Sequence, residues 1–195
     1  MRKLLCVVLA CLVLCGCSRL KPNEQSTESL DNNEMAGFYY NNSFVPFPVD
    51  MNVFTEDGWA FRCPELDGSF SLINEEKYNN VLVYVSDPDY HNTGLWDLEG
   101  TATTVEFNWD MSGESIPEFN INGVGFRSSR KDIESALGTA YASTTQEIDG
   151  VVCDVLYIVS HINDYTAMNY KVILYDDVMK SINMNVTIID VKGQG

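Results

Sequence analysis

Basic residues are scarce in this 195-residue chain. It contains 12 lysines and arginines against 28 aspartates and glutamates, which gives a formal net charge of -16 at pH 7. Binding to nucleic acid depends on clustered positive side chains that neutralise phosphates. The composition therefore argues against a nucleic-acid partner, and the excess of acid is expected to keep an exported protein in solution.

Histidine is also scarce, and the common catalytic motifs are missing. The sequence has only His91 and His161, with no Gly-x-Ser-x-Gly elbow and no His-Glu-x-x-His zinc motif. Ser160 and His161 are adjacent, so a strand would place their side chains on opposite faces. Distant residues can still assemble a triad in space, but the sequence predicts no catalytic residue, no cofactor and no metal ligand.

No apolar run is long enough to span a membrane, but the chain begins with a shorter one. Residues 4–14 are eleven consecutive apolar residues, whereas a spanning helix needs about 20. Arg2 and Lys3 precede this run, and Gly16 follows it directly before Cys17. A basic start, an apolar middle and a small residue at the cut are typical of an export leader. The sequence therefore predicts a signal peptide over residues 1–16.

The end of this leader, Leu14-Cys15-Gly16-Cys17, resembles the lipobox of bacterial lipoproteins. The resemblance implies transfer of a diacylglyceryl group to Cys17 and cleavage before it by signal peptidase II. Two acyl chains anchor a protein stably where one is marginal. Cys11 is a weaker candidate, because cleavage there would leave an apolar region at the lower limit of about 7 residues. We expect a protein held by lipid on the extracytoplasmic side of the cell membrane.

A polar segment separates the predicted anchor from the rest of the chain. Residues 17–36 are rich in Asn, Ser, Glu and Gln and show no apolar periodicity. This composition is typical of a flexible segment, which would span roughly 25 Å as a coil. We interpret residues 17–36 as a lipidated N-terminus and tether that carries a folded body.

The body is predicted to be α+β, with two similar helix-plus-antiparallel-strand units that share a sheet. The units are expected over residues 37–117 and 118–195. In the second, Ser129 and Asp132 have the spacing of a helix cap, Gly138 ends the helix, and Asp149-Gly150 is a turn signal. In the first, a short helix is expected over residues 50–56. Strands are predicted over residues 59–63, 81–85, 101–109, 151–160, 168–175 and 181–191.

The second unit carries a family resemblance. Residues 125–138, Gly-Phe-Arg-Ser-Ser-Arg-Lys-Asp-Ile-Glu-Ser-Ala-Leu-Gly, are similar to the helical signature of the SmpA/OmlA-type small lipoproteins, and residues 170–177 and 181–184 fit its closing hairpin. The body also resembles uncharacterised Gram-positive lipoproteins with two such units, arranged rather as in β-lactamase-inhibitory protein. The resemblance implies a scaffold that binds other proteins through its sheet face or loops, and it implies no catalytic residues.

Two aromatic residues are the predicted partner-binding residues. Tyr90 and Trp96 lie in an acid-flanked segment outside the predicted strands, where aromatic side chains can anchor a partner. The acids of this segment suit Ca²⁺, but their spacing does not match a Ca²⁺ loop. If the two rings instead cover the core, the partner surface is expected on the polar strand face bearing Asn183, Asn185 and Thr187.

Only two cysteines follow the predicted anchor, Cys63 and Cys153. Export would permit a disulfide between them. Alternatively both are buried free thiols, since free cysteine packs as a small hydrophobic residue. The sequence leaves both interpretations open.

These observations predict a lipid-anchored cell-envelope protein that acts as a non-catalytic binding module for another envelope protein. The alternatives are an extracytoplasmic enzyme acting on wall or envelope material, and a small-ligand or Ca²⁺ sensor. Acid pairs with raised pKa in a shared cleft would favour the enzyme. A broad exposed face rimmed by aromatic residues would favour binding.

The anchor can be tested directly. Because acylation precedes cleavage in this pathway, Cys17→Ala should abolish incorporation of labelled palmitate and leave a precursor with its leader intact. Cys11→Ala is the matched control and should leave labelling unchanged. Continued labelling of the Cys17→Ala chain, measured on a gel, would rule out the assignment.

Overall fold

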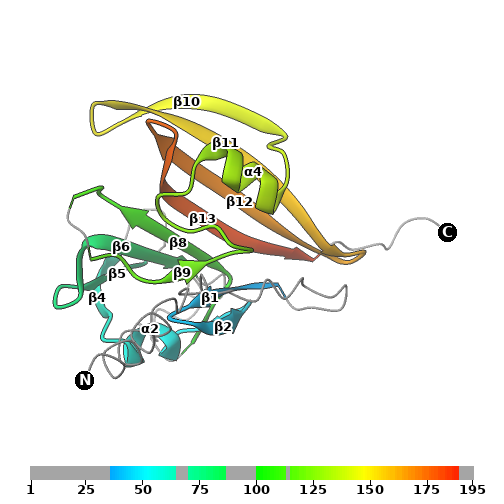
Figure 1. The fold of residues 1–195 in the computed structure, drawn as a ribbon. Coiled ribbons are helices and arrows are strands. Elements are labelled where there is room, and N and C mark those ends of the chain that lie inside the picture. The colour runs from blue at the N-terminus through cyan, green and yellow to red at the C-terminus, as the bar shows by residue number, and fades with distance from the viewer. Residues whose placement is uncertain (1–35, 65–69, 87–99, 113–114, 189–195) are drawn as a thin grey trace, which may run out of the picture.

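The structure is a computed structural model that describes residues 36–64, 70–86, 100–112 and 115–188. Thirteen strands and two short helices make up the described elements (Figure 1). The helices are α2 (Asn52–Glu56) and α4 (Arg130–Leu137). The strands are β1 (Gly37–Tyr40), β2 (Ser43–Pro46), β3 (Val49–Asp50), β4 (Ala60–Pro64), β5 (Phe70–Asn74), β6 (Tyr78–Ser86), β7 (Thr101–Ala102), β8 (Thr104–Trp109), β9 (Phe119–Asn120), β10 (Ala142–Ile148), β11 (Val151–Asn163), β12 (Thr166–Tyr175) and β13 (Val178–Ile188).

One large antiparallel sheet dominates the fold. Its eight strands lie in the order β10-β11-β12-β13-β8-β6-β5-β4. The pairing of β8 with β13 joins strands from the two halves of the chain, with Phe107 opposite Ile182 and Val105 opposite Met184. Two smaller sheets, β2-β1-β9 and β3-β7, complete the described strands. Strands from both sides of the expected boundary at residues 117 and 118 therefore form one sheet.

The predicted α+β class is wrong, because the described residues form a mostly β structure. Both expected helices exist, but they contain only five and eight residues. The apolar residues follow a period of two along β6, β8 and β13, so burial stabilises strands over most of the chain. In α4, the fully buried side chains are only Ile133 and Leu137. The described residues form one large sheet with two smaller sheets and two short helices attached, not two helix-plus-strand units.

Several local predictions are confirmed. Ser129 and Asp132 form a reciprocal capping box at the start of α4, and Gly138 follows the helix with a φ of 106°. Asp149 and Gly150 form the two-residue turn between β10 and β11, where both have positive φ values, of 54° and 78°. Strands β4, β6, β8, β11, β12 and β13 lie where the sequence predicts strands, within a few residues. The sequence does not predict strands β1, β2, β3, β5, β9 and β10.

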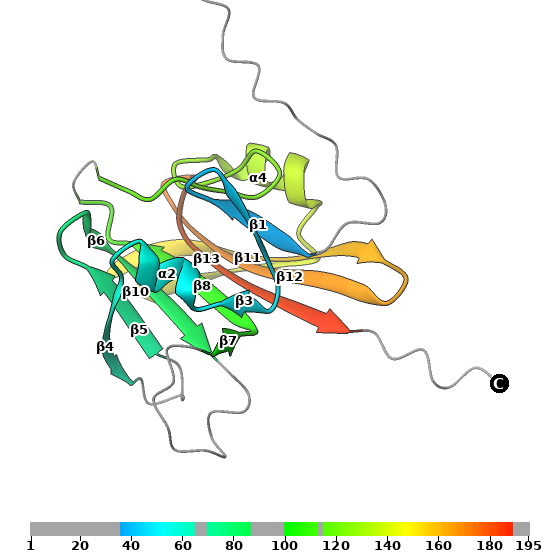
Figure 2. The same cartoon turned by 90° about the horizontal axis from the view of Figure 1, so that it is seen from below.

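The hydrophobic core lies on one face of the large sheet. Phe107 is fully buried, and its ring packs against Phe38, Phe54 and Phe119 at centroid distances of 5.7, 6.1 and 4.8 Å. These three rings come from β1, α2 and β9, so all three elements cover the same face. Helix α4 covers that face over the C-terminal strands (Figure 1), and β1 lies on the same side of the sheet as α4 (Figure 2). Among the described residues, no helix has the length and apolar character needed to cross a bilayer.

The positions of the two cysteines in the sheet decide between a disulfide and free thiols. Cys153 is a buried free thiol in β11, packed with Val155 and Ile173. Cys63 belongs to β4, at the other end of the sheet, with five strands between β4 and β11. At about 4.8 Å per strand this is about 29 Å along the sheet, whereas disulfide-linked Cα atoms lie within about 7 Å. The two cysteines therefore do not pair within one chain.

Phe107 offers a test of this core. Phe107→Ala should lower the free energy of unfolding by about 3–5 kcal/mol, because it removes a buried ring and leaves a cavity under three elements. Tyr165→Ala, at a ring that is 61% exposed, is the control and should change stability by less than about 0.5 kcal/mol. Urea denaturation measures both. Equal effects of the two substitutions would contradict the placement of Phe107 in the core.

Candidate functional site

The face of the large sheet opposite the core is polar over β8 and β13 and the adjoining part of β12, whereas over β11 it carries a small apolar cluster of Cys153, Val155 and Ile173. Strands β8, β12 and β13 are neighbours there, with Asn183 opposite both Glu106 and Lys171, and Asn185 opposite Asn169. These five side chains are half-buried, in contrast to the apolar residues that alternate with them. We name the polar sheet face by the residues that share it: Glu106, Asn169, Lys171, Asn183, Asn185 and Thr187.

Glu106 is held by two partners from the neighbouring strand. Ser181 donates a hydrogen bond to one carboxylate oxygen at 3.0 Å, and the Asn183 amide donates to the other at 3.1 Å. Both oxygens of Glu106 are thus engaged across the β8–β13 junction. These bonds fix the carboxylate in place on a rigid part of the sheet.

A second set of bonds joins β13 to β12 on its other side. The amide of Asn169 donates to Asn185 Oδ1 at 2.9 Å and to Thr187 Oγ1 at 2.7 Å. Together with Glu106 this links side chains on three adjacent strands. Side chains that are ordered before binding lose less entropy when a ligand arrives, so this face is preorganised for recognition.

Lys171 is the basic residue of the polar sheet face. It lies in β12, directly opposite Asn183. Its ammonium forms no ion pair or hydrogen bond with any residue that the structure describes. In a chain with a net charge of -16, Lys171 gives this face a local positive charge. The arrangement can present one cation beside amide and hydroxyl groups to a polar partner.

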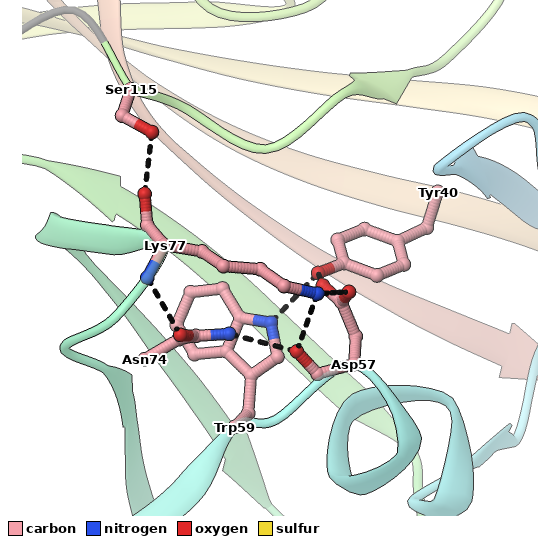
Figure 3. Close-up of polar contacts among 6 residues, drawn as sticks. All are labelled: Tyr40, Asp57, Trp59, Asn74, Lys77 and Ser115. Carbon is pink, nitrogen blue, oxygen red and sulfur yellow. Dashed lines mark hydrogen bonds and ion pairs between the residues drawn. The ribbon is translucent and has the colours of Figure 1, made fainter.

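A different polar cluster lies at the edge of the core, and Figure 3 shows it in close-up. The Tyr40 hydroxyl donates to Asp57 Oδ2 at 2.5 Å and accepts a hydrogen bond from Trp59 Nε1 at 2.7 Å. Lys77 Nζ lies 2.6 Å from Asp57 Oδ1. The Asn74 amide donates to the Asp57 carbonyl at 2.9 Å. Asp57 therefore stands at the centre of the cluster.

The electrostatics of the cluster follow from this geometry. Burial alone would raise the pKa of Asp57, but hydrogen bonds from Lys77, Tyr40 and Asn41 outweigh it and hold that pKa below its ordinary value. Burial and the bond to Asp57 raise the pKa of the Tyr40 hydroxyl far above its usual range. The hydrogen bond to Asp57 raises the pKa of Lys77. Each group is thus held in its ordinary form at neutral pH.

These contacts tie together four separate parts of the chain. Tyr40 ends β1, Asp57 follows α2, Lys77 lies in the turn between β5 and β6, and Ser115 donates to the Lys77 carbonyl. Tyr40 and Trp59 are each 3% exposed, so the cluster closes one side of the core. We interpret this cluster as structural.

Only some of the residues that the sequence singles out lie in the part of the chain that the structure describes. Cys17, Tyr90 and Trp96 lie outside the described residues, as does His91. His161 is exposed on β11, and Ser160 points to the other face as predicted. Within the described ranges no group of three or more His, Cys, Asp or Glu side chains is arranged to hold a metal ion.

The alternative patch of Asn183, Asn185 and Thr187 does lie on one strand face. Sequence reasoning missed that Glu106 and Asn169 complete it. The alternation of Glu106 with Val105 and Phe107 signals a polar face, but no local pattern reveals which strand lies beside it. Comparison of the chain with family models, curated proteins and solved structures found no match.

The Asp57 cluster predicts a pH-dependent stability. Because the folded-state pKa of Asp57 is depressed, its contribution is complete above the ordinary value near 3.8 and is lost as pH falls through the folded-state value. Asp57→Asn should therefore lower the thermal midpoint at pH 7, and the gap to the parent should narrow towards pH 2.5.

Asp164→Asn, at an exposed turn position, is the matched control and should leave the thermal midpoint nearly unchanged at both pH values. A gap between Asp57→Asn and the parent that stays constant with pH would contradict the charge-based role of Asp57.

Proposed function

We propose that this protein is a lipid-anchored protein of the cell envelope that binds a protein partner without catalysing a reaction. The leader over residues 1–16 and the cysteine at its end support the anchor. The polar, acidic stretch over residues 17–36 supports a tether. Together they would hold the sheet body at a short distance from the membrane.

The single observation that carries the binding role is the hydrogen-bonded network of the polar sheet face. It spans three adjacent strands, is fixed by bonds from Asn169, Ser181 and Asn183, and lies beside Lys171, whose other cross-strand neighbour is Tyr157. Polar contacts on a rigid surface give specificity, while a cation that lacks a partner can pair with an acidic group of another protein.

The hydrogen bonds of Glu106 and Asp57 support binding over catalysis. A general base needs an oxygen that can reach a substrate proton. Both oxygens of Glu106 accept hydrogen bonds from neighbouring side chains, and both oxygens of Asp57 are bound by Tyr40 and Lys77. The pKa of Asp57 is lowered, whereas a base poised for neutral pH would have a raised one.

A photo-crosslinking experiment tests the proposal. The full chain is expressed in cells with benzoylphenylalanine at Thr187, which is exposed on the polar sheet face. Illumination should give one defined adduct with another envelope protein. Lys171→Glu should reduce its yield several-fold, because it places a negative charge where the cation meets the partner.

Lys131→Glu is the matched control, since it makes the same charge change on an exposed position of α4, over the opposite face. Its adduct yield should equal that of the parent, and both variants should keep the parent's thermal midpoint. Equal yields from the two variants would place the partner elsewhere.

A further inference from the structure

The large sheet ends on one side in strand β10. β10 pairs with β11 and is the first strand in the order of the sheet, so its other edge faces outward (Figure 1). Six of its seven residues are exposed and the last is half-buried. An edge strand presents unpaired backbone groups that can bond to another strand.

β10 lacks most of the features that usually protect an edge. Its sequence, Ala-Ser-Thr-Thr-Gln-Glu-Ile, contains no proline, lysine or arginine. Its pairing with β11 runs through seven residues without a bulge. The opposite edge differs: β4 contains Arg62 and Pro64, and its register shifts between Phe61 and Cys63. Basic residues, prolines and bulges protect an edge from pairing, so β10, with Glu147 as its one charge, is the less protected of the two described edges of this sheet.

The register shows which backbone groups of β10 face outward. Ile148 and Val151 flank the two-residue turn, so they form a hydrogen-bonded pair, and such pairs alternate along an antiparallel ladder. Ile148, Gln146 and Thr144 thus point their backbone groups towards β11. The N–H and C=O groups of Ser143, Thr145 and Glu147 point away from it.

We propose that this edge binds β10 of a second copy of the chain, antiparallel and with the twofold axis at Thr145. In that register Thr145 pairs with Thr145 of the second copy, and Ser143 pairs with Glu147. All outward backbone groups of these three residues are then used, in about six hydrogen bonds. The two sheets would become one continuous sheet.

Charge selects this register over the others that a second copy could adopt. The chain carries a net charge of -16, so two copies repel wherever acids meet. β10 contains one charged residue, Glu147, and the twofold axis at Thr145 sets it opposite Ser143. An axis at Glu147 would place two like charges opposite each other, which destabilises a strand pair. Facing threonines, in contrast, form a favourable cross-strand pair.

Exposed apolar side chains flank the strand at both ends. Tyr141 precedes β10 and is 70% exposed, and Val152 follows its turn and is 67% exposed. In the proposed register Tyr141 of one copy lies opposite Asp149 of the other, at the end of the paired strands, whereas Val152 lies one strand further in, opposite Glu147 of its own chain. The interface is small, below about 1,200 Å², so the dimer is weak. Its yield should rise with ionic strength, because salt screens the repulsion between copies.

Cysteine crosslinking in the full chain tests this pairing. Cα atoms of a hydrogen-bonded antiparallel pair lie about 5.5 Å apart, within the range that a disulfide spans. Thr145→Cys in membranes of expressing cells should give a covalent dimer under mild oxidation, at several times the yield of Thr187→Cys. Thr187 is also an exposed strand threonine, and the parent chain reports the background from native cysteines.

A second variant separates pairing from misfolding. Ser143→Cys with Glu147→Cys should also crosslink between copies, since the two positions face each other in the proposed register. Adding Thr145→Pro should abolish this product, because proline removes the outward N–H and leaves the bonds to β11 intact. The thermal midpoint should stay near that of the parent.

Three results would overturn the proposal. The first is a yield of Thr145→Cys dimer no higher than the yield of Thr187→Cys dimer. The second is a crosslinked product with the mass of a different protein. The third is a dimer of the Ser143→Cys, Glu147→Cys chain that still forms when Thr145→Pro is added.

Discussion

Burial of one face of the eight-stranded sheet beneath aromatic side chains is the interaction on which the rest of the structure depends. Phe107 lies near the junction of β8 and β13, and rings from β1, α2 and β9 converge on it. Because side chains alternate along a strand, this arrangement commits every second residue of β8, β12 and β13 to the other face. The apolar layer therefore decides which residues of these strands lie on the polar sheet face as well as in the core.

The Asp57 cluster provides hydrogen-bond partners for the polar groups that this aromatic layer buries. Tyr40 and Trp59 contribute large apolar areas, but each also carries a polar group, and a buried polar group without a partner costs about 1–3 kcal/mol. The hydrogen bonds Trp59 to Tyr40 and Tyr40 to Asp57 satisfy both groups in series, and Lys77 neutralises the carboxylate at the end. The ion pair between Lys77 and Asp57 therefore completes the hydrogen bonding of the buried aromatic side chains. This explains why the ion pair lies at the rim of the core.

The sequence predicts those elements whose signal is local. The cap of α4 at Ser129, the turn at Asp149-Gly150 and the alternating strands each depend on residues a few positions apart. The fold class is not local, because two short helices of five and eight residues suggest an α+β fold until the strands of both halves are considered together. Strand β10 has no apolar alternation, since both of its faces are exposed. The contact of Glu106 with Ser181 joins residues 75 positions apart, and only the strand order reveals it.

The two proposed surfaces are compatible because they use different parts of one sheet. A twofold axis at Thr145 that relates hydrogen-bonded antiparallel strands stands perpendicular to the sheet, so it keeps both polar sheet faces on the same side. β1, which begins the described chain at its N-terminal end, lies on the core side in each copy. The described parts of both chains would then begin on the side opposite the polar faces, which suits the two membrane anchors proposed above. A partner that met two polar faces at once would gain affinity from their shared attachment rather than from any new contact. Pairing at the edge would thereby strengthen binding at the face without altering a single residue there.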